Sequence, residues 1–140
     1  MAPAFGKNSV ETISVVRAND RSTTTSDETT EILISPEKLN GNRARISIIE
    51  IKPGKQTKWQ NHEGHEYVMV EEGKVTAEFA DTIDIAIDQR KREDLSEGDG
   101  VAFNSAIYHS FINKGDSMAK LIIARPTKSL PKGMNFSGYD

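Results

Sequence analysis

QNHEGHE at residues 60–66 contains two of the three histidines of the chain, and GDGVAFNSAIYHSFIN at residues 98–113 contains the third. Imidazole is the side chain that proteins use most often for metal binding and for proton transfer near neutral pH. Each segment adjoins a run of strand-forming residues, so the two can lie on neighbouring strands. We therefore expect the histidine-bearing segments to converge on one site.

Much of the chain consists of short runs rich in β-branched and aromatic residues, bounded by Gly, Asp or Asn. We also expect a strand at residues 82–88, because isoleucines alternate there with polar residues. Short strands at regular spacing predict an all-β fold, either a sandwich or a barrel. The expected strands are residues 11–17, 30–35, 43–52, 66–70, 74–79, 82–88, 100–103, 107–113 and 119–124.

A length of 140 residues is enough for one domain with its own core. We predict a flexible N-terminal arm at residues 1–10, a single barrel domain at residues 11–125 and a C-terminal tail at residues 126–140. Residues 19–30 are polar and are expected to form a loop. The basic cluster at residues 90–92 is expected to form a solvated turn.

The composition excludes several classes of function. The chain has no cysteine, so a metal ion would need nitrogen and oxygen ligands. A net charge of -3 argues against nucleic acid as a partner. No apolar stretch is long enough to cross a membrane, and the N-terminus has no secretory apolar region. We therefore expect no membrane association and a cytoplasmic location.

Strand geometry indicates which side chains share a face. Successive side chains of a strand point to opposite faces. Gln60, His62 and Glu66 have the same parity, so in an extended segment they face one interior. His65 has the opposite parity and is expected to face outward or a neighbouring sheet. His109 begins a later strand, and it joins His62 and Glu66 if its face is also the interior.

The two segments resemble the two motifs of the cupin superfamily in the spacing of their glycines, histidines, glutamate and asparagine. The first motif is carried here by Gly54, His62, Glu66 and Gly73, and the second by Gly98, His109 and Asn113. The resemblance covers about residues 43–125. It implies a cupin-type double-stranded β-helix, or jelly-roll, barrel.

The chain departs from the cupin pattern at two places. Gln60 stands where many cupins have a further histidine, and Asn104 and Ala106 replace a proline and a glycine of the second motif. The first departure leaves two histidines and one carboxylate. That ligand set is associated with non-haem Fe(II), which keeps open positions for substrate and dioxygen. The pattern is also similar to that of the iron-dependent fosfomycin epoxidase cupins.

The resemblance implies a mononuclear non-haem Fe(II) oxidoreductase, an oxygenase (dioxygenase) or oxidase acting on a small polar metabolite, with a metal-dependent lyase or isomerase as the second choice. His62, Glu66 and His109 would be both the metal ligands and the catalytic residues, with Gln60 as a fourth ligand or a hydrogen-bond donor. Fe(II) is the favoured ion, and zinc, nickel and manganese are alternatives. The expected substrate pocket is formed by Lys58, Ile48, Val68, Phe103 and Phe111.

Two other functions are open for a cupin of this kind. One is a non-catalytic protein that binds or senses a small molecule and works with a partner protein. The other is a metal-free dehydratase or isomerase with His62 or His109 as general base. The sequence does not identify the substrate in either case.

A homodimer is expected from the N-terminal part of the chain. The predicted strand at residues 11–17 lies outside the cupin motifs and would leave an exposed edge unless it pairs. Cupins often exchange such a strand between two subunits, so the resemblance implies a dimer.

Overall fold

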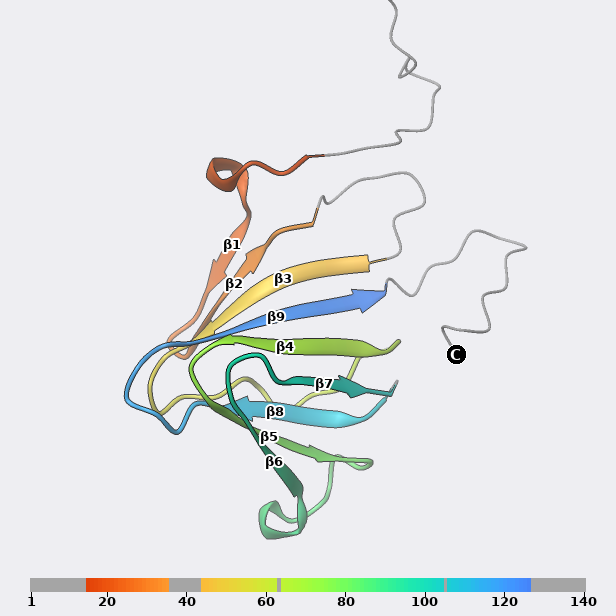
Figure 1. Ribbon diagram of the computed structural model, residues 1–140. Coiled ribbons are helices and arrows are strands. Elements are labelled where there is room, and N and C mark those ends of the chain that lie inside the picture. The colour runs from red at the N-terminus through yellow and green to blue at the C-terminus, as the bar shows by residue number, and fades with distance from the viewer. Residues whose placement is uncertain (1–14, 36–43, 63, 105, 127–140) are drawn as a thin grey trace, which may run out of the picture.

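The computed structural model describes residues 15–35, 44–62, 64–104 and 106–126, which form two antiparallel sheets (Figure 1). The expected arm at residues 1–10, and all of the expected tail except Pro126, lie outside the described residues. The strands are β1 (Thr23–Thr25), β2 (Thr29–Leu33), β3 (Ala44–Ile51), β4 (Glu66–Glu72), β5 (Val75–Ala80), β6 (Lys91–Leu95), β7 (Gly100–Phe103), β8 (Tyr108–Ile112) and β9 (Ala119–Pro126).

The larger sheet has the strand order β1-β2-β3-β9-β4-β7, and the smaller has the order β6-β5-β8. Every named pair is antiparallel. Single bridges join Gln56 to Ile112 and Gln60 to His109, so residues 56–60 continue the smaller sheet beyond β8. The predicted all-β jelly-roll class is confirmed.

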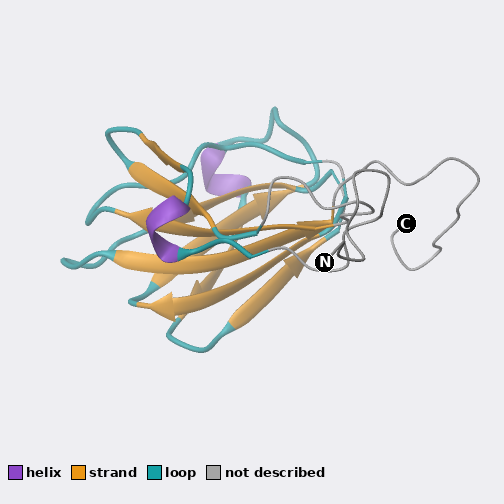
Figure 2. Cartoon of the chain, turned by 90° about the horizontal axis from the view of Figure 1, so that it is seen from above, coloured by secondary structure: helices purple, strands orange, loops and turns teal. Residues whose placement is uncertain are grey.

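Two single-turn 3-10 helices, η1 (Ala18–Asp20) and η2 (Ile87–Gln89), are the helices of the described residues (Figure 2). Within these ranges, no helix has the length and apolar character needed to span a membrane. The cytoplasmic location stays a prediction.

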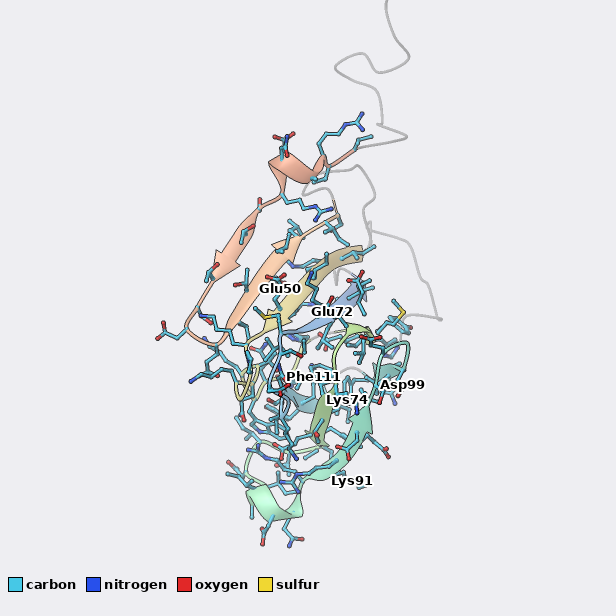
Figure 3. All side chains as sticks on the ribbon, turned by 60° about the vertical axis from the view of Figure 1, so that its left-hand side comes forward. Glu50, Glu72, Lys74, Lys91, Asp99 and Phe111 are labelled. Atoms are coloured by element: carbon cyan, nitrogen blue, oxygen red, sulfur yellow. The ribbon has the colours of Figure 1, made fainter. Side chains whose placement is uncertain are left out.

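The core lies between the sheets and draws on six strands, β3, β4, β5, β7, β8 and β9. The largest of its side chains with at most 1% of their surface exposed are Ile51, Val70, Phe111 and Leu121. Figure 3 shows Phe111 at the centre of the molecule. Burying one such side chain stabilises the fold by about 1.5–3 kcal/mol. The strands that carry the second cupin motif are therefore anchored by the core itself.

Most of the expected strands are confirmed to within two residues at their ends, but the prediction at residues 82–88 is wrong. Residues 83–84 form a turn, η2 follows, and Ile83 and Ile87 are exposed. A period of two marks a strand only where one face is buried against another layer. The strand lies instead at β6, which includes part of the predicted solvated turn at residues 90–92. β6 is an edge strand, where charged side chains are well tolerated.

The N-terminal part of the described chain also differs from expectation. The predicted loop at residues 19–30 contains β1, which pairs with β2 through Thr23 and Ile32. Threonine favours strands, and this pair needs no buried side chain on β1. Residues 15–17, the described part of the predicted strand at residues 11–17, do not form a strand.

β6 is attached to β5 by a buried carboxylate. Glu78 on β5 is 4% exposed. Its Oε1 accepts a hydrogen bond from Arg90 Nη1 at 3.1 Å, and its Oε2 accepts one from Arg92 Nε at 2.8 Å. Removing one partner of a buried ion pair leaves the other charge uncompensated, which is costly.

We predict that Glu78→Ala lowers the free energy of unfolding by about 2–3 kcal/mol, less than for a fully buried pair because Arg92 is partly exposed. The exposed neighbour Glu93 on β6 supplies the control, since Glu93→Ala should change stability by less than about 0.5 kcal/mol. Urea unfolding followed by the fluorescence of Trp59 measures both. Equal effects of the two substitutions would contradict this role of Glu78.

Candidate metal site

Backbone pairing brings the two histidine-bearing segments together. The Gln60 N–H donates to His109 O at 3.2 Å, and the His109 N–H donates to Gln60 O at 2.9 Å. A few residues further on, the Ala106 N–H donates to His62 O at 3.1 Å. The rings of His62 and His109 consequently lie with their centroids 5.6 Å apart. These contacts are between main-chain atoms, so they position the histidines without any ion.

Glu66 completes the cluster from the larger sheet. It is the first residue of β4, points inward with Val68 and Val70, and is 3% exposed. Its Oε2 lies 2.6 Å from His109 Nε2, and its Oε1 lies 3.5 Å from His62 Nε2. One ligand atom from each of the three residues lies within 4.8 Å of the other two. The structure therefore brings together the three residues predicted as ligands.

The surroundings of His109 fix its tautomer. His109 Nδ1 lies 2.9 Å from Ile107 O, and a carbonyl oxygen can only accept, so Nδ1 carries the proton. In the neutral ring the lone pair is then on Nε2, which faces Glu66 Oε2. That carboxylate oxygen is buried and accepts no hydrogen bond from the described residues. Two acceptor atoms that face each other can bind a cation between them. A hydrogen bond from the other ring nitrogen, here Nδ1, to a backbone carbonyl is also typical of metal-binding histidines.

His62 has a different environment. Arg125 Nη1 lies 2.9 Å from His62 Nδ1, and a guanidinium can only donate. The lone pair of the neutral ring is therefore on Nδ1, and Nε2 carries the proton. Burial, and after it the positive charge of Arg125, hold the pKa of His62 below its usual range. His62 is consequently neutral near neutral pH, which is the form that binds metal ions.

The cluster opens into a cavity of about 440 Å³ between the sheets. Four carboxylates and two cationic side chains line it, and Arg45, which does not line it, pairs with one of the carboxylates, Glu31. The carboxylates are Asp27, Glu28, Glu31 and Glu66, and the cations are Lys58 and Arg125. The facing acceptors of His109 and Glu66, the neutral ring of His62 beside them and the net negative charge of the lining fit a divalent cation held by these three residues.

Some of the residues predicted to form the substrate pocket line the cavity, and others lie in the core. Lys58 and Phe111 line the cavity, and so does Gln60. Val68 and Phe103 belong to the buried core rather than to the wall. The ring of Phe103 stacks on His109, with centroids 4.5 Å apart and planes 7° apart, so it holds the orientation of that ligand.

Ile48 does not line the cavity, because the other face of β3 points inward. Ser47 and Ile49 form that part of the wall, in line with the fully buried Ile51. Isoleucines occur on both faces of β3, so the sequence alone does not distinguish them. His65 is half-buried and is not part of the three-residue group.

Sequence reasoning missed Arg125 and Glu31. Arg125 on β9 shares parity with the inward-facing Leu121 and Ile123, and Glu31 on β2 shares parity with the buried Leu33. A charged residue at an inward position of a strand is a signal for a functional group or a buried ion pair. This signal was present in the sequence.

Comparison with known proteins identifies the family. The cupin domain family matches residues 47–124, which is more than half of the chain. The chain therefore belongs to the cupin family. Among curated proteins, none matches the sequence significantly.

Solved structures show the same fold at low sequence identity. Drosophila melanogaster CENP-C bound to CAL1 matches with a TM-score of 0.62 and 13% identity, over 81% of this chain and 85% of that chain. Hydroxypropylphosphonic acid epoxidase from S. wedmorenis matches with a TM-score of 0.69 and 17% identity, over 88% and 64%. Fe(II)-HppE with the alternative substrate (S)-1-HPP matches with a TM-score of 0.67 and 16% identity, over 81% and 60%.

The turn that precedes β8 is strained at Ala106. Its φ of 73° is the one positive value at a non-glycine residue of the described ranges. This is the position where the second cupin motif usually has glycine. A left-handed conformation costs an L-residue about 1–2 kcal/mol. The strain is retained at a residue whose N–H binds the backbone of His62.

We predict that Ala106→Gly raises the free energy of unfolding by about 0.5–1 kcal/mol, because relief of the strain exceeds the added entropy of the unfolded chain. Chemical denaturation measures the change. The matched control is Ala102→Gly on β7, where φ is not positive, and this substitution should destabilise the protein. Loss of stability in Ala106→Gly would show that the turn is not strained.

Proposed function

We propose that this cupin is a metal-dependent enzyme, most simply a mononuclear non-haem Fe(II) oxygenase or oxidase that acts on a small polar metabolite in the 440 Å³ cavity. His62, Glu66 and His109 hold the ion, which would supply open coordination positions for substrate and dioxygen when bound. The structural likeness to Fe(II)-HppE supports iron over zinc, nickel or manganese.

The observation that carries the proposal is the buried pair of His109 Nε2 and Glu66 Oε2. The hydrogen bond to Ile107 O leaves a lone pair on Nε2 of the neutral ring, and Oε2 lies only 2.6 Å away, a contact that a proton or a metal ion stabilises. Two lone pairs at this distance repel unless a positive charge lies between or beside them. A third ligand, His62, lies on the side of the other carboxylate oxygen.

The cavity walls indicate the kind of substrate. Thr24, Ser47 and Thr57 contribute hydroxyl groups, and Ile49, Phe111 and Ile123 contribute apolar surface. A divalent ion would offset the net negative charge of the residues that line the cavity. A small molecule with hydroxyl or carboxylate groups fits these walls, and the backbone-held ligands orient it while the apolar side excludes water. Gln60 stands on the wall and is proposed to donate a hydrogen bond to that molecule or to act as a fourth ligand.

We predict that the purified protein binds about one Fe(II) or Mn(II) ion per chain. His62→Ala and His109→Ala should each weaken binding by more than about 100-fold, because loss of even an outer-sphere partner costs 10–100-fold. Anaerobic equilibrium dialysis with elemental analysis measures the metal content. His65→Ala is the matched control, since His65 is not one of the three clustered residues and its loss should leave the metal content unchanged.

Undiminished metal content in His62→Ala and His109→Ala would overturn this site. Oxygen consumption with Fe(II) and a panel of small hydroxy and carboxylic acids then tests the activity. Turnover that persists in excess chelator would favour a metal-free dehydratase or isomerase instead.

Binding without catalysis is the second candidate. The match to Drosophila CENP-C, solved with CAL1, extends over most of both chains. A cupin fold is therefore compatible with binding a protein partner. A ligand that raises the melting temperature without turnover, with or without metal, would favour this candidate.

We also propose that two copies associate through the outer face of the larger sheet. Tyr67 and Met69 on β4 are 50% and 42% exposed there. Their neighbours on β9, β3 and β7 are also apolar or glycine, and they are Ala124, Ile122, Ile46, Ile48, Ala102 and Gly100. The paired charges of Glu50 and Lys120 border this surface, so two copies can meet without net repulsion. This surface supports a homodimer independently of the N-terminal strand.

Sedimentation velocity at micromolar concentration should show a species of twice 15.5 kDa. The double substitution Tyr67→Lys, Met69→Glu should shift it to the monomer, because charges are unfavourable at the centre of an apolar interface. Ile87→Glu is the control, because Ile87 is 64% exposed but lies on η2, outside the larger sheet. A wild-type protein that sediments only as a monomer would contradict the dimer.

A further inference from the structure

We propose that Arg125 competes with the metal ion for His62 and Glu66, so that this side chain sets how tightly the site binds its ion. The inference rests on the proposed metal site and assigns a role to a residue outside the ligand set. Arg125 lies on β9 and reaches into the cavity between the sheets.

The guanidinium contacts two of the three proposed ligands. Arg125 Nη1 lies 2.9 Å from His62 Nδ1, and Arg125 Nε lies 3.7 Å from Glu66 Oε1. The side chain is 23% exposed, so these contacts are shielded from water on most sides. Arg125 therefore supplies positive charge at the place where a metal ion would supply it.

The chemistry of imidazole makes the two occupants exclusive at His62. A neutral ring has one lone pair and one N–H. While Arg125 donates to Nδ1, the lone pair is used there and the proton on Nε2 blocks coordination through Nε2. If instead the ion binds Nδ1, it takes the place of the guanidinium directly. Either mode of coordination requires the bond between Arg125 and His62 to break.

A second carboxylate is placed to receive Arg125 when that bond breaks. Arg125 Nη2 lies 3.9 Å from Glu31 Oε2. The Ser47 hydroxyl donates to the same oxygen at 3.0 Å, which orients the Glu31 carboxylate. Glu31 Oε1 also pairs with Arg45 Nη2 at 3.5 Å. A small rotation of the Arg125 guanidinium would thus move it away from Glu66 and closer to Glu31.

Titration of the metal-free protein with Mn(II), followed by calorimetry, tests the proposal. Arg125→Met should bind Mn(II) at least tenfold more tightly than the wild type, because the competitor is gone. Arg45→Met is the matched control, since Arg45 also pairs with Glu31 and is also cationic but does not contact the ligands. It should change the affinity less than threefold.

Glu31→Gln supplies an independent measurement that does not depend on the folding of Arg125→Met. It should weaken Mn(II) binding severalfold, because the displaced guanidinium loses its partner. In the double variant with Arg125→Met this effect should shrink, since the two residues act through one contact. Arg125→Lys, which keeps the charge without the planar fork, should lie between wild type and Arg125→Met.

The outcomes separate the two proposals. A wild type that binds Mn(II) through His62 and His109, with Arg125→Met no tighter than wild type, would overturn the competition and leave the metal site standing. The same effect in Arg45→Met as in Arg125→Met would also overturn it, since a general loss of positive charge would then suffice. Absence of Mn(II) binding in every variant would overturn both.

Discussion

The antiparallel bridge between Gln60 and His109 is the constraint on which the site depends. Two main-chain hydrogen bonds join Gln60 to His109, another from Thr57 to Phe111 holds the same segment beside β8, and one from Ala106 to His62 fixes the direction in which the chain leaves the sheet. Because these bonds use no side-chain atom, the positions of the two histidines follow from the fold. The buried core beneath β8, centred on Phe111, keeps this backbone in place.

Glu66 links the two sheets electrostatically. It enters from β4 of the larger sheet and meets His109 from the smaller one, while Arg125 from β9 approaches the same carboxylate. A buried carboxylate must be matched by positive charge or by donors. The chain carries one of these, the guanidinium of Arg125, and under the proposed function an ion from solution would be the other. The affinity of the proposed site for metal would then be the difference between these two states rather than a property of the three proposed ligands alone.

Much of the fold and the clustering of His62, Glu66 and His109 could be predicted from the sequence. Period-two patterns located the strands that face the core, and the spacing of His62, Glu66 and His109 indicated their convergence. The exceptions have physical reasons. Alternation at residues 82–88 has no opposing layer to bury it, and β6 is a charged edge strand without an apolar pattern. Isoleucines on both faces of β3 concealed which face is internal, so Ile48 was chosen where Ser47 and Ile49 form the wall. The sequence marks Arg125 and Glu31 as charges at inward positions, but their contacts with each other and with the cluster depend on the register between β2, β3 and β9, which is a tertiary property.

Anomalous diffraction from crystals of the Fe(II)-loaded protein, grown without oxygen, tests the central claim most directly. The account predicts one anomalous peak per chain, within bonding distance of a ring nitrogen of His62, a ring nitrogen of His109 and a carboxylate oxygen of Glu66, with the Arg125 guanidinium moved away from His62. A peak bound elsewhere on the chain, or none at these side chains in protein exposed to saturating Fe(II), would contradict it.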